Sequence, residues 1–304
     1  MRSINSRKSL YGLLTFSAVL IHGATAGNEG LELIPIAALT RNIPTHPDQP
    51  VTGSQFAATI ANLDAWHREQ AVKKELLGGN LPSFLRNLAP VTLTYRPTNG
   101  KIVNATVFVM PEYLAIGSDK DFLRIPMNLY TAAAVASRMG FVLPTRKIVN
   151  AIYQQSSFHF APQPMTAGPQ MRSTEYYRVH NEKIEEQSRT LGIMSGVLVS
   201  GDKKDIVLTN LLEKNPGRIA IYGWHRLSGT PIQPLSTVHG ACYEDYSHGV
   251  RLVSEKMIVD GQPRSIYDVL KDATLSPIVS DEGPIPDARD IITRTAGEMP
   301  CWQS

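Results

Sequence analysis

Apolar residues recur at helical spacing in several stretches of the chain, and each stretch is bounded by residues that typically begin or end a helix. In the first stretch, Phe56, Ile60 and Leu63 follow Ser54, which is suited to cap a helix, and Gly78 ends the pattern. The predicted helices span 54–77, 129–139, 146–155, 173–189 and 265–271. Charged residues cover most of the fourth stretch, so we expect that helix to lie exposed.

Shorter runs of β-branched and apolar residues predict strands, and most of these runs lie in the second half of the chain. The predicted strands span 91–95, 102–110, 196–200, 206–209, 218–224, 249–253 and 256–259. Polar turn sequences at 96–101 and 201–205 predict two hairpins. The fold class is therefore α+β, with a helical N-terminal half that carries one β-hairpin and a mainly antiparallel sheet in the C-terminal half.

Residues 1–26 have the pattern of a secretory signal peptide, because basic residues precede an apolar run and small residues occupy positions 24 and 26. The apolar run, 10–21, has about a dozen residues, whereas a membrane-spanning helix needs roughly 20. We expect cleavage after Ala26, a secreted or periplasmic protein, and no membrane span in the mature chain. The remainder is expected to form an α-rich region with the hairpin, 27–172, and a sheet-containing region, 173–304, as two domains or as one.

The net charge of +3 originates in the expected signal peptide, which holds three of the 30 Lys and Arg residues and none of the 27 Asp and Glu residues. The mature chain is then balanced, which argues against nucleic acid as a partner. The oligomeric state is left open. The two cysteines, Cys242 and Cys301, are expected to pair in an oxidising compartment. The alternative is that Cys242 is a free catalytic thiol.

Residues 219–253 hold the densest group of chemically capable side chains. Histidines and an aspartate at strand ends and in loops can converge as a catalytic group, in which a histidine acts as the general base and the aspartate orients it. The candidate catalytic residues are His225, His239, Asp245 and His248. The candidate substrate-binding residues are Lys204, Trp224, Tyr243, Tyr246 and Arg251. For Lys203-Lys204-Asp205 two interpretations stay open: a solvated turn, or a segment that recognises an anion or carboxylate beside the site.

Ser247-His248-Gly249-Val250-Arg251-Leu252, with His239-Gly240 upstream, resembles the signature of the L,D-transpeptidases of the cell wall. The resemblance covers under 20 residues. That family has a nucleophilic cysteine after the glycine, where this chain has Val250, so the resemblance does not carry the family's chemistry. The stretch also resembles a group of uncharacterised exported proteins with Tyr-Gly-Trp-His and Asp-Tyr-Ser-His-Gly patterns, which implies one structural unit but no activity.

These residues support a hydrolase or acyl-transfer enzyme that acts on an extracytoplasmic polymer or peptide. No cofactor is evident, but a divalent metal bound by the histidines and Asp245 is a second possibility. A non-catalytic secreted binding protein with an aromatic and arginine-lined groove is the third. On an extended chain, alternate residues face opposite sides, so Asp245 can partner His248 only if the loop bends between them.

Overall fold

A computed structural model describes residues 34–98, 100–292 and 301. The signal peptide expected at 1–26 lies outside the described residues. Within the described part of the chain, no helix combines the length and the apolar character that crossing a membrane requires. The fold is a mixture of helices and mainly antiparallel sheets, as the α+β assignment predicts.

Most of the predicted helices are confirmed, two of them to the residue. The α-helices are α1 Ile36–Thr40, α2 Gly53–Ile60, α3 Ala65–Leu77, α4 Leu129–Met139, α5 Arg146–Gln155, α6 Thr174–Leu191, α7 Leu211–Lys214 and α8 Ile266–Lys271. Short 3-10 turns occupy Ser83–Arg86, Pro169–Arg172 and Ser276–Ile278. The ends of α4 and α5 follow local signals. Gly140 ends α4 with a φ of 79°, and the Thr145 hydroxyl accepts a hydrogen bond from the backbone N–H of Ile148 at the start of α5.

The single helix predicted at 54–77 is wrong, because the chain forms two helices that are separated by residues 61–64. The Asp64 side chain accepts a hydrogen bond from the backbone N–H of His67 at 2.9 Å and so begins α3 as a new helix. A carboxylate at this position satisfies one of the backbone donors that every helix start leaves free. Leu63, which the pattern placed on the apolar stripe, is 37% exposed.

The largest sheet joins strands from both sides of residue 172. Its strands are β1 Ala89–Tyr95, β2 Val103–Val109, β5 Phe141–Val142, β12 Val253–Ser254, β13 Lys256–Val259 and β14 Gln262–Ser265. The predicted hairpin of β1 and β2 is confirmed, with Leu93 opposite Ala105. On its other edge β2 pairs antiparallel with β12 and β13.

The second sheet carries the central stretch of the sequence. Its strands, in spatial order, are β10 Pro231–Ser236, β9 Ile221–His225, β8 Lys204–Ile206 and β11 His248–Gly249. The pairs are antiparallel except β8 with β11, in which His248 lies opposite Lys204. Two further pairs are β3 Ala115–Gly117 with β4 Phe122–Arg124, and β6 Phe158–His159 with β7 Val199–Ser200.

The hairpin predicted around 201–205 is wrong. Strand β7 pairs in parallel with β6, and β8 pairs with β9 and β11 instead of with β7. The turn predicted to be solvated is also wrong, because Asp202, Lys203 and Asp205 are buried and Lys204 is half-buried. A polar sequence that is typical of an exposed turn is here buried, and burial raises the pKa of Asp202 and of Asp205 to about 7.

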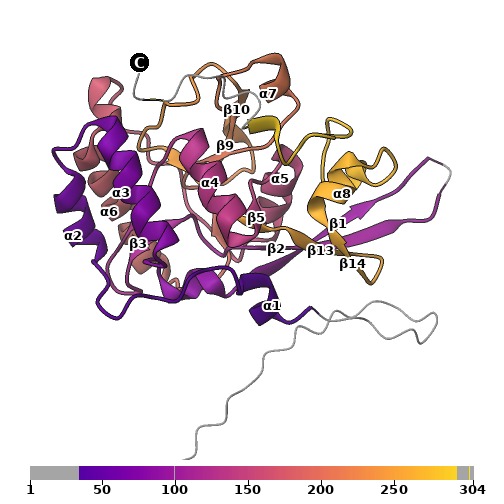
Figure 1. Cartoon of the computed structure of the whole chain (residues 1–304), viewed down its shortest axis with the longest axis horizontal. Coiled ribbons are helices and arrows are strands. Elements are labelled where there is room, and N and C mark those ends of the chain that lie inside the picture. Colours follow the sequence, from indigo (N-terminus) through magenta and orange to yellow (C-terminus); the bar gives the residue numbers. More distant parts are fainter. Residues whose placement is uncertain (1–33, 99, 293–300, 302–304) are drawn as a thin grey trace, which may run out of the picture.

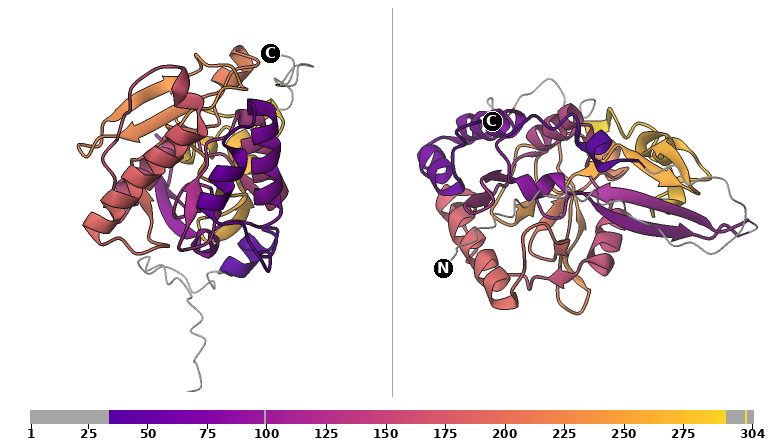
Figure 2. Two further views of the ribbon diagram at one scale, coloured as in Figure 1. Left: turned by 90° about the vertical axis from the view of Figure 1, so that its left-hand side faces the viewer. Right: turned by 90° about the horizontal axis from the view of Figure 1, so that it is seen from below.

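One hydrophobic cluster extends from Leu39 to Ile292 and packs between the sheets and helices. Figure 1 shows α2, α3 and α6 at one end of the molecule, and the β1–β2 hairpin extending past α8 at the other end. The view from below in Figure 2 gives the same arrangement. The contact between α6 and the central stretch is made by His180, which accepts a hydrogen bond from Lys203 and packs against the rings of Trp224 and Tyr246.

Candidate functional site

The loop before β11 bends, as a partnership of Asp245 with His248 requires. The backbone carbonyl of Asp245 accepts a hydrogen bond from the N–H of His248 at 3.0 Å. The Asp245 carboxylate also accepts bonds from the backbone N–H and the hydroxyl of Ser247, at 2.7 and 2.5 Å. As a result His248 Nε2 lies 3.9 Å from Asp245 Oδ2, and both residues are buried.

His239 and Tyr243 cover this buried pair. The two rings are stacked with centroids 4.2 Å apart, and the Tyr243 hydroxyl donates a hydrogen bond to Asp245 Oδ2 at 3.1 Å. The ring of His239 lies 6.4 Å from that of His248. Both covering residues are half-buried, so they are the members of the group that solvent reaches. We call His239, Tyr243, Asp245 and His248 the His-Asp group.

Burial dominates the electrostatics of the His-Asp group. It lowers the pKa of His248 to about 4 against the attraction of Asp245, and it lowers the pKa of His239. Burial acts to raise the pKa of Asp245, but His248 and the bonds from Ser247 outweigh it and lower that pKa. Both histidines are therefore neutral at pH 7. Among the described residues, neither ring nitrogen of His248 has a hydrogen-bond partner, an arrangement that normally has a functional or structural reason.

Two adjacent lysines approach the group, Lys203 directly before β8 and Lys204 at its first position. The ammonium of Lys204 lies 5.3 Å above the ring of Trp224, and its charge acts on the pKa of both histidines and of Asp245. Lys203 is buried and donates hydrogen bonds to Tyr246 O at 2.6 Å and to His180 Nδ1 at 3.1 Å. Burial lowers the pKa of Lys203 to about 8.

His180 was not predicted as a site residue, because the charged pattern of its helix indicates a surface position. The helix is exposed on one side only. Its buried residues include Tyr177, His180 and Ile184, which follow one another at helical spacing. The narrow apolar stripe of this helix could have indicated that His180 is buried, because His180 lies between Tyr177 and Ile184 on that stripe.

Three predicted substrate-binding residues lie in the interior. Arg251 is 1% exposed and donates to the backbone carbonyls of Met110 and Val199 at 2.9 and 2.7 Å. Tyr246 is buried, and its hydroxyl accepts a bond from the N–H of Met165. Trp224 is buried and adopts a φ of 51°, which is rare for a bulky residue. These side chains stabilise the frame of the site and are not on its surface.

His225 lies apart from the His-Asp group. Its ring stacks on Tyr153 of α5 with centroids 4.5 Å apart, and its Nε2 bonds to Asn150 Oδ1 at 3.2 Å. The structure thus brings His239, Asp245 and His248 together, with Tyr243 and Lys204, and places His225 in different surroundings.

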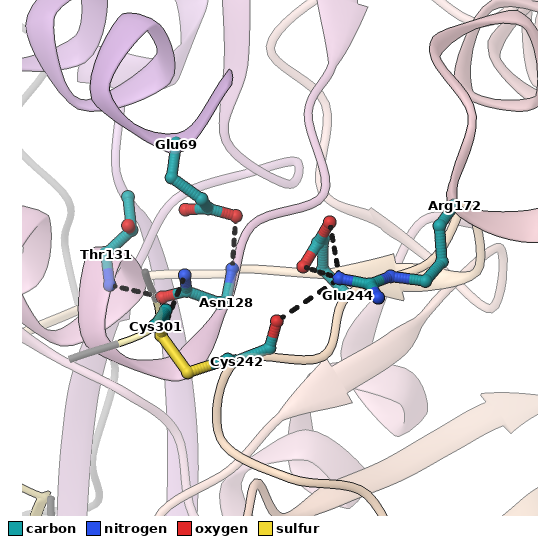
Figure 3. The surroundings of a disulfide bond; sticks show 7 residues. All are labelled: Glu69, Asn128, Thr131, Arg172, Cys242, Glu244 and Cys301. Carbon is teal, nitrogen blue, oxygen red and sulfur yellow. Dashed lines mark hydrogen bonds and ion pairs between the residues drawn. A yellow bond between two sulfur atoms is a disulfide. The ribbon is translucent and has the colours of Figure 1, made fainter. Parts of the chain in front are cut away.

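The predicted disulfide between Cys242 and Cys301 is confirmed, with Cα atoms 5.5 Å apart, so the free-thiol alternative is wrong. Figure 3 shows the bond beside Asn128, whose side-chain nitrogen lies 3.8 Å from Cys301 Sγ. Cys242 directly precedes Tyr243. The bond therefore fixes the loop that presents the stacked rings of the His-Asp group.

A buried carboxylate pair lies next to this disulfide. Glu244 forms ion pairs with Arg68 at 2.5 Å and with Arg172 at 3.3 Å, and Figure 3 shows Arg172 turned toward it. Glu69 accepts a hydrogen bond from the backbone N–H of Asn128 at 2.9 Å. Burial, followed by repulsion from Glu244, raises the pKa of Glu69 to about 7.

The described residues contain no group of three or more His, Cys, Asp or Glu side chains that is arranged to hold a metal ion. The divalent-metal alternative stays a prediction. No protein-family model, no curated protein and no solved structure matches the chain. The function is therefore argued from the site alone.

Proposed function

We propose that the protein is an exported hydrolase or acyl-transfer enzyme that acts on an extracytoplasmic polymer or peptide through the His-Asp group. The observation that carries the proposal is the half-buried imidazole of His239, which is stacked on a tyrosine anchored to buried Asp245, and burial lowers the pKa of that imidazole. A neutral imidazole that solvent can reach is the side chain best suited to accept a proton near pH 7.

In this proposal His239 takes a proton from a water molecule, the water oxygen attacks the carbonyl carbon of the substrate, and the imidazolium returns the proton to the leaving group. Ser247 is not the nucleophile that we favour, because its hydroxyl is fully buried and donates to Asp245. In acyl transfer, an acceptor hydroxyl or amine replaces the water. Lys204 supplies positive charge for the oxyanion that develops.

Tyr243 and Asp245 act as positioning residues. The hydroxyl of Tyr243 is held by Asp245 at 3.1 Å, and burial, followed by the charge of Asp245, raises the pKa of Tyr243 to about 12. The Tyr243 hydroxyl therefore stays protonated and its ring stays fixed. The imidazole of His239 is held in place by stacking on that ring. A fixed base loses less freedom in the transition state than a mobile one.

The test is turnover of purified protein with cell-wall, peptide and ester substrates, with and without a chelator. His239→Gln should lower the rate by about 10²–10⁴. His67→Gln is the matched control, since that histidine is on the exposed face of α3 and bonds only to Asp64 within the described residues. It should retain the wild-type rate.

Turnover that His239→Gln leaves within about twofold of wild type would refute the assignment of the base, since a general base contributes far more. Binding of a substrate with no turnover would favour the secreted binding protein instead. Loss of turnover with the chelator would favour the metal-dependent hydrolase.

A further inference from the structure

We infer a second binding site, for a saccharide unit, in a cavity that His225 lines and to which no member of the His-Asp group contributes. The cavity has a volume of about 340 Å³ and lies between the C-terminal part of α5 and the turn that joins β9 to β10. Its lining includes Asn150, Tyr153, Gln154, His159, His225 and Ser228. The volume is within the range of small-molecule sites, about 300–1,000 Å³.

Three rings form a rigid wall of the cavity. The ring of Tyr153 lies between those of His159 and His225, with centroid distances of 4.3 and 4.5 Å. The Tyr153 hydroxyl donates to Arg226 O at 2.7 Å, and His159 Nε2 donates to Tyr153 O at 2.7 Å. A wall fixed in this way gives a ligand apolar surface with little loss of side-chain freedom.

Among the residues that the structure describes, the cavity lining carries no acidic side chain and no lysine or arginine. Burial, followed by electrostatic repulsion from the neighbouring His159, lowers the pKa of His225 to about 4. Asn150 Oδ1 accepts bonds from the hydroxyl of Tyr222 at 2.8 Å and from His225 at 3.2 Å. Both lone pairs of that oxygen are thus used, and the amide nitrogen of Asn150 has no partner among the described residues.

This chemistry fits a sugar better than an ion. Hydroxyl groups both donate and accept, as do the amide of exposed Gln154 and the hydroxyl of exposed Ser228. The apolar C–H face of a sugar ring packs on the face of an aromatic ring, and His159 and His225, which flank Tyr153, are the rings of the wall that have a further face. An anion or cation would find no opposite charge here, and a buried or half-buried charge without a partner is costly.

The site is independent of the proposed catalysis, because its residues come from α5, β6, the end of β9 and the β9–β10 turn and not from the loop at 239–248. A polymer that contains sugars would bind with one sugar unit in this cavity while the bond that reacts lies at the His-Asp group. Failure of the catalytic proposal would leave this inference intact, and the reverse is also true.

The test titrates the full exported protein with three probes, N-acetylglucosamine trisaccharide, cellotriose and maltotriose, and follows binding by saturation-transfer NMR and calorimetry. Ser228→Trp fills the cavity from its exposed rim, and Ser228→Ala is the matched control. At least one probe should bind, and Ser228→Trp should weaken its binding by about tenfold or more, because ligand and indole compete for the same space.

Ser228→Ala should keep the affinity within about twofold, since one rim hydroxyl contributes little, and both variants should keep the wild-type melting temperature. Three results would overturn the inference: no binding of any probe, binding that Ser228→Trp leaves unchanged, or binding of Zn²⁺ without binding of any saccharide.

Discussion

Replacing Gly249 by alanine is expected to destabilise the protein, whereas the same change at Gly240 is not. Both glycines follow a histidine in the sequence, and neither has a positive φ. They differ only in their surroundings. A Cβ atom at 249 would lie 2.6 Å from the ring of Tyr113 and 2.7 Å from Cβ of Lys203, whereas at 240 the nearest atom is Gly217 O at 4.0 Å.

The contact at 249 has no easy relief. Tyr113 is buried, its hydroxyl donates to Asp205 at 2.9 Å, and Arg251 lies 4.4 Å above its ring. Overpacking of this kind costs about 1–3 kcal/mol. Alanine returns about 0.4–1 kcal/mol by restricting the unfolded chain, so the expected net loss for Gly249→Ala is about 1–2 kcal/mol. For Gly240→Ala only the second effect applies.

Urea unfolding followed by tryptophan fluorescence measures both variants. Gly249→Ala should lower the midpoint while the slope with denaturant stays that of wild type, and Gly240→Ala should match or slightly exceed the wild-type midpoint. Equal midpoints for the two variants would refute the reasoning, because they would show that a Cβ atom at position 249 fits beside Tyr113 and Lys203 without loss of stability.

Two further predictions concern the region around the disulfide. Cys301→Ser should cost about 4 kcal/mol by the chain-entropy relation for a bond between residues 59 apart, and thiol titration of the unfolded, unreduced wild type should find no free thiol; two thiols would contradict the pairing. The pKa of Glu69 is raised from 4.5 to about 7 in the folded state. Between these two pH values the folded protein therefore keeps a proton on Glu69 that the unfolded chain has released. The contribution of Glu69 to stability therefore falls as pH rises from about 4.5 to 7, by at most about 1.4 kcal/mol per pH unit. Glu69→Gln should remove this part of the slope in unfolding experiments between pH 5 and 7, and an unchanged slope would show that Glu69 does not carry it.

The sequence by itself determined the elements whose signals are local. Helices α4 and α5 were predicted to the residue, because Gly140 and Thr145 set their boundaries within one turn of the chain. The β1–β2 hairpin followed from two apolar runs joined by a short turn. With only two cysteines in a chain expected to be exported, the partner of Cys242 was also determined.

Tertiary structure decided what depends on distant partners. Asp202, Lys203 and Asp205 have the composition of a solvated turn, yet they are buried: Arg124 Nε lies 3.9 Å from Asp202, Lys203 donates to His180, and Tyr113 donates to Asp205. A charged residue can be buried only where such partners are present, and the sequence pattern near 203 contains none of them.

In the candidate site, too, some features follow from local sequence and others from contacts between distant elements. Residues 219–253 were identified from composition, and the bend that brings Asp245 to His248 is set within four residues by bonds of the Asp245 side chain and carbonyl. The separation of His225 was not predictable, because it depends on the packing of β9 against α5 and on the stack with Tyr153. Local hydrogen bonds thus shape the loop, whereas the packing of distant elements decides which histidines meet.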